Sequence, residues 1–151
     1  MEDGKRGVAF TRQLDTEDLA DLAGVEVTAH QFQQRIDPKA YDARVVVIGE
    51  HQFGFAIRAS TPEAQLDFRR DYHALSYEHV EIPDQVSKGV TELMLTLGLM
   101  FAAIDFVVEP AGEWVFIGDV NPGGQYGWLQ AATDAPLTDC LADLLSAGQP
   151  A

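Results

Sequence analysis

Three oxygen-bearing side chains, Asp105, Asp119 and Asn121, stand in two apolar segments joined by the turn-like stretch 110–113. If the turn is centred on Gly112, the two aspartates are equally far from it and face each other across a β-hairpin. Because side chains return to one face of a strand every second residue, Asn121 shares that face. Like charges directly opposite destabilise a sheet, and a divalent cation removes the conflict. Oxygen donors alone favour Mg²⁺ shared with nucleotide phosphates.

A purely structural interpretation of the same residues stays open. The stretch 119–122 is also typical of an Asx-type turn that ends a strand, with Asp105 at a sheet edge. One residue more or fewer in the turn moves Asp105 out of opposition. Spacing alone does not choose between the two interpretations, and the register of the hairpin decides.

Two arginines have the chemistry to contact a metal-held polyphosphate. Arg44 follows Asp42, and Arg69 lies between Asp67 and Asp71. Arginine is always charged and forms paired hydrogen bonds to phosphate oxygens, so an arginine on the same sheet would suit such a ligand. The alternative, which the residues alone favour, is an ion pair with the adjacent aspartate.

A glycine-rich turn over residues 121–124 precedes Gln125, Tyr126 and Trp128. These side chains are candidates to line a pocket, although core packing is the more common role of buried aromatic residues. Cys140 is the single cysteine, and its acidic neighbours disfavour a thiolate, so we expect it to serve packing.

The charge of the chain is strongly negative and unevenly spread. Its 151 residues include 24 Asp or Glu and 10 Lys or Arg, a formal net charge of -14. Such a charge repels phosphate backbones and anionic lipid, which argues against nucleic-acid and membrane partners. All ten cationic side chains lie at or before Lys88. If the two halves form one body, arginines are expected to face carboxylates across a cleft.

Length and composition indicate one globular domain. Apolar residues make up 46% of the chain and charged residues 23%, a balance typical of a protein with a packed core. The first residues lack the apolar stretch of a secretory signal, and no apolar run reaches the roughly 18 residues of a membrane span. We therefore expect a cytoplasmic protein.

Hydrophobic periodicity predicts an alternation of helices and strands. Helices are predicted over 15–24, 83–98, 127–132 and 137–147. The helix over 83–98 carries an apolar stripe made of Val86, Val90, Leu93, Met94 and Leu97. Strands are predicted over 25–36, 43–48, 53–59, 101–109 and 114–120. Residues 61–75 have no period and are predicted to form a loop.

Together these segments resemble the C-terminal part of an ATP-grasp ligase, and most of all the ribosomal peptide maturases that form microviridin-type graspetides. An ordered series of motifs carries the resemblance: Phe32–Ile36, Asp42–Gly49, Asp67–Arg69, Ala103–Asp105 and Asp119–Gln125. It extends from about Val8 to Ser146. It implies an α+β fold, the ATP-grasp C-terminal subdomain, with a mostly antiparallel sheet and flanking helices. Residues 1–151 would then form the C-terminal part of an ATP-grasp domain, and the N-terminal domains of the family would be missing.

The resemblance also implies a nucleotide site. In the family, a hinge segment receives adenine through backbone groups. It corresponds here to Phe32–Ile36, which makes Gln34, Arg35 and Ile36 the implied adenine-binding residues. Arg44 and Arg69 match arginines near the phosphates and the acyl-phosphate intermediate, which makes them the implied catalytic residues. Asp105, Asp119 and Asn121 match the Mg²⁺ ligands, in agreement with the hairpin argument. ATP and Mg²⁺ are the implied cofactors.

The chemistry implied by the resemblance is ATP-dependent activation of a side-chain carboxylate in a precursor peptide. A hydroxyl or amine then attacks the acyl phosphate and forms an ester or amide. Three departures from the family bear on this expectation. The segment Asp37–Lys39 is a variant of the family pattern after the hinge and bears on the ribose contacts. Asp119 stands where the family usually has glutamate, and the upstream lysine and flexible loop of the longer ligases have no counterpart here.

These departures leave alternatives. The chain is expected to work with an upstream half-enzyme or as a homodimer. A non-catalytic remnant that binds a peptide or protein through an exposed sheet is a second interpretation. A third is an ATP-grasp ligase that acts on a small amino acid.

Overall fold

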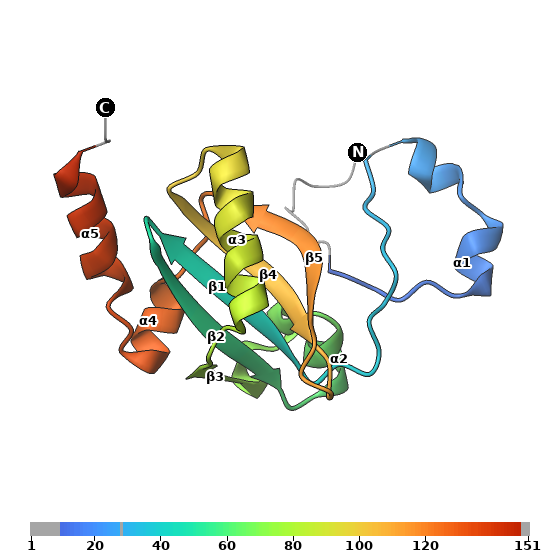
Figure 1. Ribbon diagram of the computed structural model, residues 1–151. Helices are drawn as coiled ribbons and strands as arrows, with labels where there is room; N and C mark the ends of the chain where they lie inside the picture. The colour runs from blue at the N-terminus through green and yellow to red at the C-terminus, as the bar shows by residue number, and fades with distance from the viewer. Residues whose placement is uncertain (1–9, 28, 149–151) are drawn as a thin grey trace, which may run out of the picture. The chain divides into compact units, whose positions relative to one another are not determined.

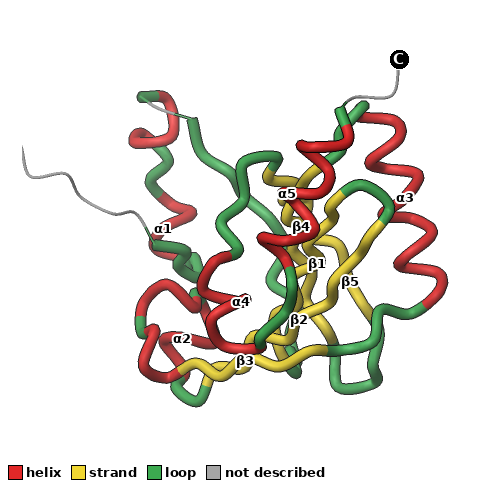
Figure 2. The backbone as a smooth tube through the Cα atoms, turned by 90° about the vertical axis from the view of Figure 1, so that its left-hand side faces the viewer, coloured by secondary structure: helices red, strands yellow, loops and turns green. Residues whose placement is uncertain are grey.

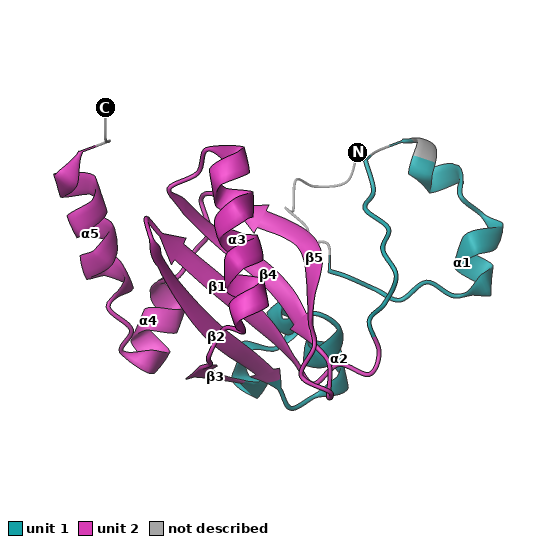
Figure 3. Ribbon diagram, in the orientation of Figure 1, with its two compact units in different colours: residues 1–36, 59–75 teal, residues 37–58, 76–151 magenta. Residues whose placement is uncertain are grey.

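The computed structural model describes residues 10–27 and 29–148. The chain divides into two compact units (Figure 3). The first unit comprises residues 1–36 and 59–75, and the second comprises residues 37–58 and 76–151.

The second unit is built on a five-stranded sheet with the strand order β3-β2-β1-β4-β5 (Figure 1). The strands are β1 (Tyr41–Ile48), β2 (His51–Ala59), β3 (Leu75–His79), β4 (Phe101–Val108) and β5 (Trp114–Asn121). β1 pairs antiparallel with β2 and β4, and β4 pairs antiparallel with β5. The predicted α+β class with a mostly antiparallel sheet is confirmed. The four strands predicted from residue 43 onward are also confirmed, with ends that differ by one or two residues.

Helices cover both faces of this sheet, as the side view shows (Figure 2). On one face, α3 (Asp84–Leu97) packs Val90 and Met94 against alternate residues of β1 and β4. On the other face, α4 (Gly127–Thr133) and α5 (Leu137–Ala147) bury Leu129 and Leu137 against the ends of β1 and β2. These three helices were predicted, but Leu97 does not belong to the buried stripe because it is 50% exposed.

Cys140 packs against the cluster under α4 and α5, as expected for a packing residue. Within residues 10–27 and 29–148, no helix combines the length and the apolar character needed to cross a bilayer.

The strand predicted over 25–36 is wrong for the described part of that segment. Val25 lies in a 3₁₀ turn (Ala23–Glu26), and residues 29–36 have no regular structure. Val27 and Phe32 are 83% and 56% exposed. A strand needs a neighbour for its backbone hydrogen bonds, and no described strand pairs with this segment.

The helix predicted over 15–24 is shorter than expected. α1 spans Thr16–Ala20. Asp15 caps it by accepting hydrogen bonds from the amides of Glu17 (2.8 Å) and Asp18 (2.9 Å). Leu19 is 58% exposed, so the helix has little apolar packing to extend it beyond its capped first turn.

Residues 61–75 form short helical turns and not the predicted loop. α2 (Pro62–Leu66) begins where the Thr61 hydroxyl accepts a hydrogen bond from a backbone amide. Asp67 and Asp71 cap the 3₁₀ turns Phe68–Arg70 and Tyr72–Ala74 in the same way. Each turn is too short to show a hydrophobic period, and its capping side chain specifies it locally. β3, which follows directly, was missed because it is only five residues long.

Candidate functional site

The β4–β5 hairpin brings Asp105 directly opposite Asp119, as their spacing predicts. Asn121 lies two residues further along β5, on the same face, opposite Ala103. Asp105 is 9% exposed, whereas Asp119 and Asn121 are at exposed positions. Two carboxylates and one amide from neighbouring strands therefore share one face, one of them buried and two open to solvent.

The chain reaches this register by a different route from the one predicted. Near the turn, Phe106 pairs with Phe116. Regular pairing from that point would bring Asp105 opposite the residue directly after Phe116. Residues 117–118 instead form a bulge, whose glycine has a φ of +80°. The two extra residues shift the register, and Asp119 comes opposite Asp105.

Arg44 on β1 extends the pair into a row across three strands. It is the partner of Asp105 in the β1–β4 ladder. Its Nε donates to Asp105 Oδ1 and its Nη2 donates to Asp105 Oδ2, each at 2.7 Å. Its Nη1 donates to the carbonyl oxygen of Gln125 at 3.2 Å, and its guanidinium carbon lies 5.5 Å from the centroid of a Trp128 ring. The segment after the hairpin therefore orients the arginine.

The Arg44–Asp105 pair is largely buried. The two side chains are 11% and 13% exposed. Burial lowers the pKa of Arg44, but the hydrogen bonds and charge of Asp105, with the charge of Asp119, outweigh it and raise the pKa above its ordinary value. The row holds one positive and two negative side chains, and Asp119 lies at its exposed end.

The two arginines differ in the ion pairs that they form. Arg44 pairs with Asp105 and not with Asp42, whose carboxylate accepts hydrogen bonds from Lys39 Nζ at 2.8 and 3.0 Å. Arg69 does pair with the nearby Asp67, as the ion-pair alternative for it stated. Sequence analysis expected arginines to face carboxylates across a cleft. Arg44 instead meets the carboxylate of Asp105 on the adjacent strand of the same sheet.

Asp67 is a buried carboxylate of the first unit with several hydrogen-bond donors around it. It is 7% exposed and accepts from Arg69 Nε (2.8 Å), Arg69 Nη2 (2.6 Å) and the amide of Thr11 (2.9 Å). Burial raises the pKa of Asp67, but these hydrogen bonds and the charge of Arg69 outweigh it and hold that pKa at about 2. Arg69 therefore orders the turn after α2.

The predicted adenine-binding residues also belong to the first unit. Gln34, Arg35 and Ile36 lie in a segment without regular structure, and Arg35 Nη1 donates to Gln13 Oε1. The structure therefore brings together four of the predicted residues in the second unit: Arg44, Asp105, Asp119 and Asn121. The other four are in the first unit: Gln34, Arg35, Ile36 and Arg69.

The donors on β4 and β5 fit a hard divalent cation. The Asn121 Oδ1 atom accepts from the Gly123 amide at 3.1 Å, which orients it, and an amide oxygen keeps a second lone pair. Each Asp105 oxygen likewise accepts one bond from Arg44 and keeps further acceptor capacity. No group of three His, Cys, Asp or Glu residues suited to a metal ion occurs in the part of the chain that the structure describes. Such a partial donor set suits Mg²⁺, which commonly completes its shell with water and substrate phosphates.

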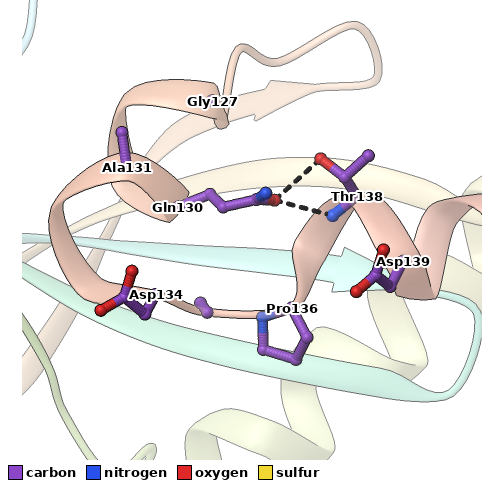
Figure 4. A pocket seen from close by; sticks show the side chains of 8 residues that line it. Gly127, Gln130, Ala131, Asp134, Pro136, Thr138 and Asp139 are labelled. Carbon is purple, nitrogen blue, oxygen red and sulfur yellow. Dashed lines mark hydrogen bonds between the residues drawn. The ribbon is translucent and has the colours of Figure 1, made fainter.

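A hollow between α4 and α5 forms a second polar feature of this unit (Figure 4). Gln130 Oε1 accepts hydrogen bonds from the amide and the hydroxyl of Thr138, each at 2.8 Å. Asp134 and Asp139 border the same hollow. The Gln130–Thr138 contact joins the two helices. Sequence analysis missed it because the two residues lie on different helices and carry no motif.

Comparison by sequence finds no family model that matches the chain and no matching curated protein. Comparison of structures does find matches. Macrocyclase MdnC of Microcystis aeruginosa MRC, solved with precursor peptide MdnA, has a TM-score of 0.78 and 32% identity, covering 93% of this chain and 44% of that one. A RiPP-associated ATP-grasp ligase of Chryseobacterium gregarium, solved with ADP and a leader and core peptide, has a TM-score of 0.85 and 28% identity, covering 99% and 46%.

The chain shares its fold with the RiPP ATP-grasp ligases. The ATP-grasp ligase PsnB, solved with a minimal precursor, Mg and ADP, has the same fold at a TM-score of 0.65 and 23% identity, covering 91% of this chain and 44% of that one. The ATP-grasp resemblance drawn from the ordered motifs is thereby confirmed. The chain spans less than half the length of these three ligases.

Proposed function

We propose that this chain is the part of an ATP-dependent ligase that holds the metal and the phosphates during activation of a precursor-peptide carboxylate. The row of Arg44, Asp105 and Asp119, with Asn121 beside it, is the observation that carries the proposal. A guanidinium and three oxygen-bearing side chains on one sheet face suit a magnesium-bound nucleotide. The likeness to one ligase solved with its precursor peptide, and to another solved with ADP and a leader and core peptide, supports the same assignment.

Each side chain of the row has its own task in this proposal. Arg44 holds the Asp105 carboxylate in one orientation through two hydrogen bonds. Asp119 and Asn121 present oxygen atoms at exposed positions, where a ligand can reach them. When bound there, Mg²⁺ would supply charge neutralisation on the nucleotide phosphates.

The roles of the first-unit residues rest on the family resemblance. Gln34, Arg35 and Ile36 would receive adenine through their backbone groups. Arg69 would contribute its guanidinium near the acyl phosphate, where a fixed positive charge stabilises the transferring phosphoryl group. Its pairing with Asp67 holds it in one orientation before any ligand binds.

The proposed reaction has two steps. A carboxylate oxygen of the peptide attacks the γ-phosphorus of ATP, which gives an acyl phosphate and ADP. A hydroxyl or amine of the same peptide then attacks the acyl carbon, the phosphate leaves, and an ester or amide forms. No covalent bond to the protein is needed in either step.

Because the chain covers less than half of the related ligases, the complete site would include residues from the rest of a full-length ligase. We propose that these residues come from the same polypeptide, from an upstream half-enzyme or from a second copy of the chain. Nucleotide binding by the 151 residues alone is then expected to be weak and to strengthen when the remainder is supplied.

Calorimetric titration with ADP, in Mg²⁺ and in EDTA, tests the proposal. We expect ADP to bind only when Mg²⁺ is present. We expect this binding to be lost in Asp119→Asn, because the substitution removes the negative charge of an exposed ligand and leaves the Arg44–Asp105 pair in place. Asp42→Asn is the matched control, because it removes the same charge from the neighbouring strand β1 and leaves the row intact. Equal binding in the two variants would contradict the metal assignment.

One observation favours the non-catalytic alternative. Both Asp105 oxygens already accept hydrogen bonds from Arg44, so the buried pair is satisfied without a metal. A peptide-binding remnant predicts that ADP with Mg²⁺ produces no heat in the chain alone or with the remaining ligase length supplied. It also predicts that a precursor-type acidic peptide still binds.

A further inference from the structure

We propose that Gly118 is a positioning residue for the proposed metal site: its left-handed backbone maintains the bulge that brings Asp119 directly opposite Asp105. This inference rests on the proposed function for its meaning, because the two carboxylates matter as a pair only if they share a cation. Its structural part, the control of the strand register, can be tested separately.

The bulge changes which residue faces Asp105. The pair Phe106–Phe116 sets the register near the turn, and regular pairing beyond it would bring Ile117 opposite Asp105. In that register Asp119 would lie two residues further along β5 than the residue opposite Asp105, at the diagonal position. Side chains directly opposite are about 4.5–5.5 Å apart at Cβ, whereas diagonal neighbours are about 7–8 Å apart. A single cation bridges the first spacing far better than the second.

The hydrophobic pattern does not by itself select the bulged register. A slip of two residues returns every side chain to the same face of the sheet, because the side-chain period of a strand is two. Among the described strands β5 lies at the edge of the sheet, so a slip there leaves the other strand pairs intact. The local backbone of residues 117–118 therefore has a large share in deciding the register.

Gly118 is suited to this role for a backbone reason. Its φ of +80° lies in the region that glycine adopts readily and that other L-residues avoid. A Cβ atom added there would meet no heavy atom within 4 Å. Gly118→Ala would thus act on the backbone preference and not through a steric clash.

Gly112 offers a matched control in the same hairpin. It has a φ of +88°, and an added Cβ would also meet no heavy atom within 4 Å. Gly112→Ala therefore carries a comparable backbone penalty at the turn, while residues 117–118 stay as they are. Gly118→Asn is the conservative variant, because asparagine tolerates the left-handed region better than alanine does.

The experiment uses the full 151-residue chain, labelled with ¹⁵N and ¹³C, with Mn²⁺ as a paramagnetic probe in place of Mg²⁺. In the unsubstituted chain and in Gly112→Ala, we expect cross-strand nuclear Overhauser contacts between Asp105 and Asp119, and selective broadening of both amide signals by Mn²⁺. In Gly118→Ala, we expect these contacts to be lost and broadening to require about tenfold more Mn²⁺. Gly118→Asn should restore much of both signals.

The outcomes separate this inference from the proposed function. If Mn²⁺ does not broaden Asp105 and Asp119 in the unsubstituted chain, the proposed metal site fails, and the Overhauser contacts alone decide whether Gly118 controls the register. If Mn²⁺ binds but Gly118→Ala and Gly112→Ala keep the same contacts and the same metal requirement, the positioning role of Gly118 is overturned. A merely structural role predicts equal losses of stability in both variants and no change in metal requirement.

Discussion

Arg44 and Arg69 each form a two-pronged ion pair with an aspartate, but the aspartates lie at very different distances along the chain. Asp67 is two residues before Arg69, whereas Asp105 is 61 residues after Arg44. A turn of the local backbone is enough to form the first pair. The second requires β1 and β4 to be neighbours in the sheet, so only the tertiary structure identifies Asp105 as the partner.

Arg44→Met should show that the buried pair is costly to break. The substitution leaves the Asp105 carboxylate, 13% exposed, without its counter-charge, and such changes destabilise by about 3–5 kcal/mol. Urea unfolding should report this loss. The double variant Arg44→Met with Asp105→Leu should recover much of it, because no buried charge remains. A single variant as stable as the unsubstituted chain would contradict the burial of the pair.

Asp67 should make the first unit less stable in acid. Its pKa falls from an ordinary value of 3.8 to about 2 on folding. A carboxyl group whose pKa is lower in the folded than in the unfolded state stabilises the folded state at pH values above its unfolded pKa. This stabilisation is lost as the pH falls from about 5 toward about 2. The loss is at most about 2 kcal/mol. Unfolding monitored at Tyr72 or Phe10 should show it, and Asp67→Asn should flatten that part of the pH profile.

At the scale of the elements, length decided which were predictable. α3 has 14 residues and β4 has eight, so each shows a clear hydrophobic pattern. The capped turns over 61–75 and the five-residue β3 do not. The segment 25–36 shows the opposite error, since its apolar residues suggested a strand although no described strand pairs with it.

The turn after β5 depends on a glycine for its close approach to β4. A Cβ on Gly124 would lie 2.4 Å from the Cβ of Ala103 and 3.1 Å from a backbone oxygen, whereas a Cβ on Gly123 would lie 3.9 Å from its nearest neighbour. We expect Gly124→Ala to destabilise by about 1–3 kcal/mol and Gly123→Ala to have little effect. Urea unfolding of the two variants measures the difference.

The same pair of variants bears on the site. The turn leads directly to Gln125, whose carbonyl oxygen accepts from Arg44, and to Trp128. Gly124→Ala should therefore also weaken Mg²⁺-dependent ADP binding more than Gly123→Ala does. Equal stability and equal binding in the two variants would mean that the turn does not rest on β4.

For the molecule as a whole, charge is the dominant property. The formal net charge is -14, and no Lys or Arg follows Lys88. Arg44 neutralises the charge of Asp105 within the site, and the many carboxylates of the chain favour a cation near Asp119 and Asn121. In the proposed function, Mg²⁺ would screen the nucleotide phosphates from this acidic chain.

Salt should stabilise the folded chain. Raising NaCl from about 0.01 M to about 0.15 M shortens the screening length from about 30 Å to about 8 Å and weakens repulsion among the carboxylates. We expect the free energy of unfolding to rise by on the order of 1 kcal/mol. Urea titrations at the two salt concentrations, with NaCl compared against MgCl₂ at equal ionic strength, test this. A fall in stability with added NaCl would show that attractive surface pairs outweigh the repulsion.

The sequence by itself determined the class of the fold, the long helices and strands, and the ATP-grasp resemblance, and it showed that Asp105 and Asp119 could share one face of a hairpin. It could do so because strand and helix periods, side-chain parity and motif order are properties of neighbouring residues. Only the tertiary structure decided that Arg44 binds Asp105 and that a bulge at Gly118 brings Asp119 opposite it. Strand order and register arise from contacts between distant segments, and a two-residue shift leaves the hydrophobic pattern unchanged.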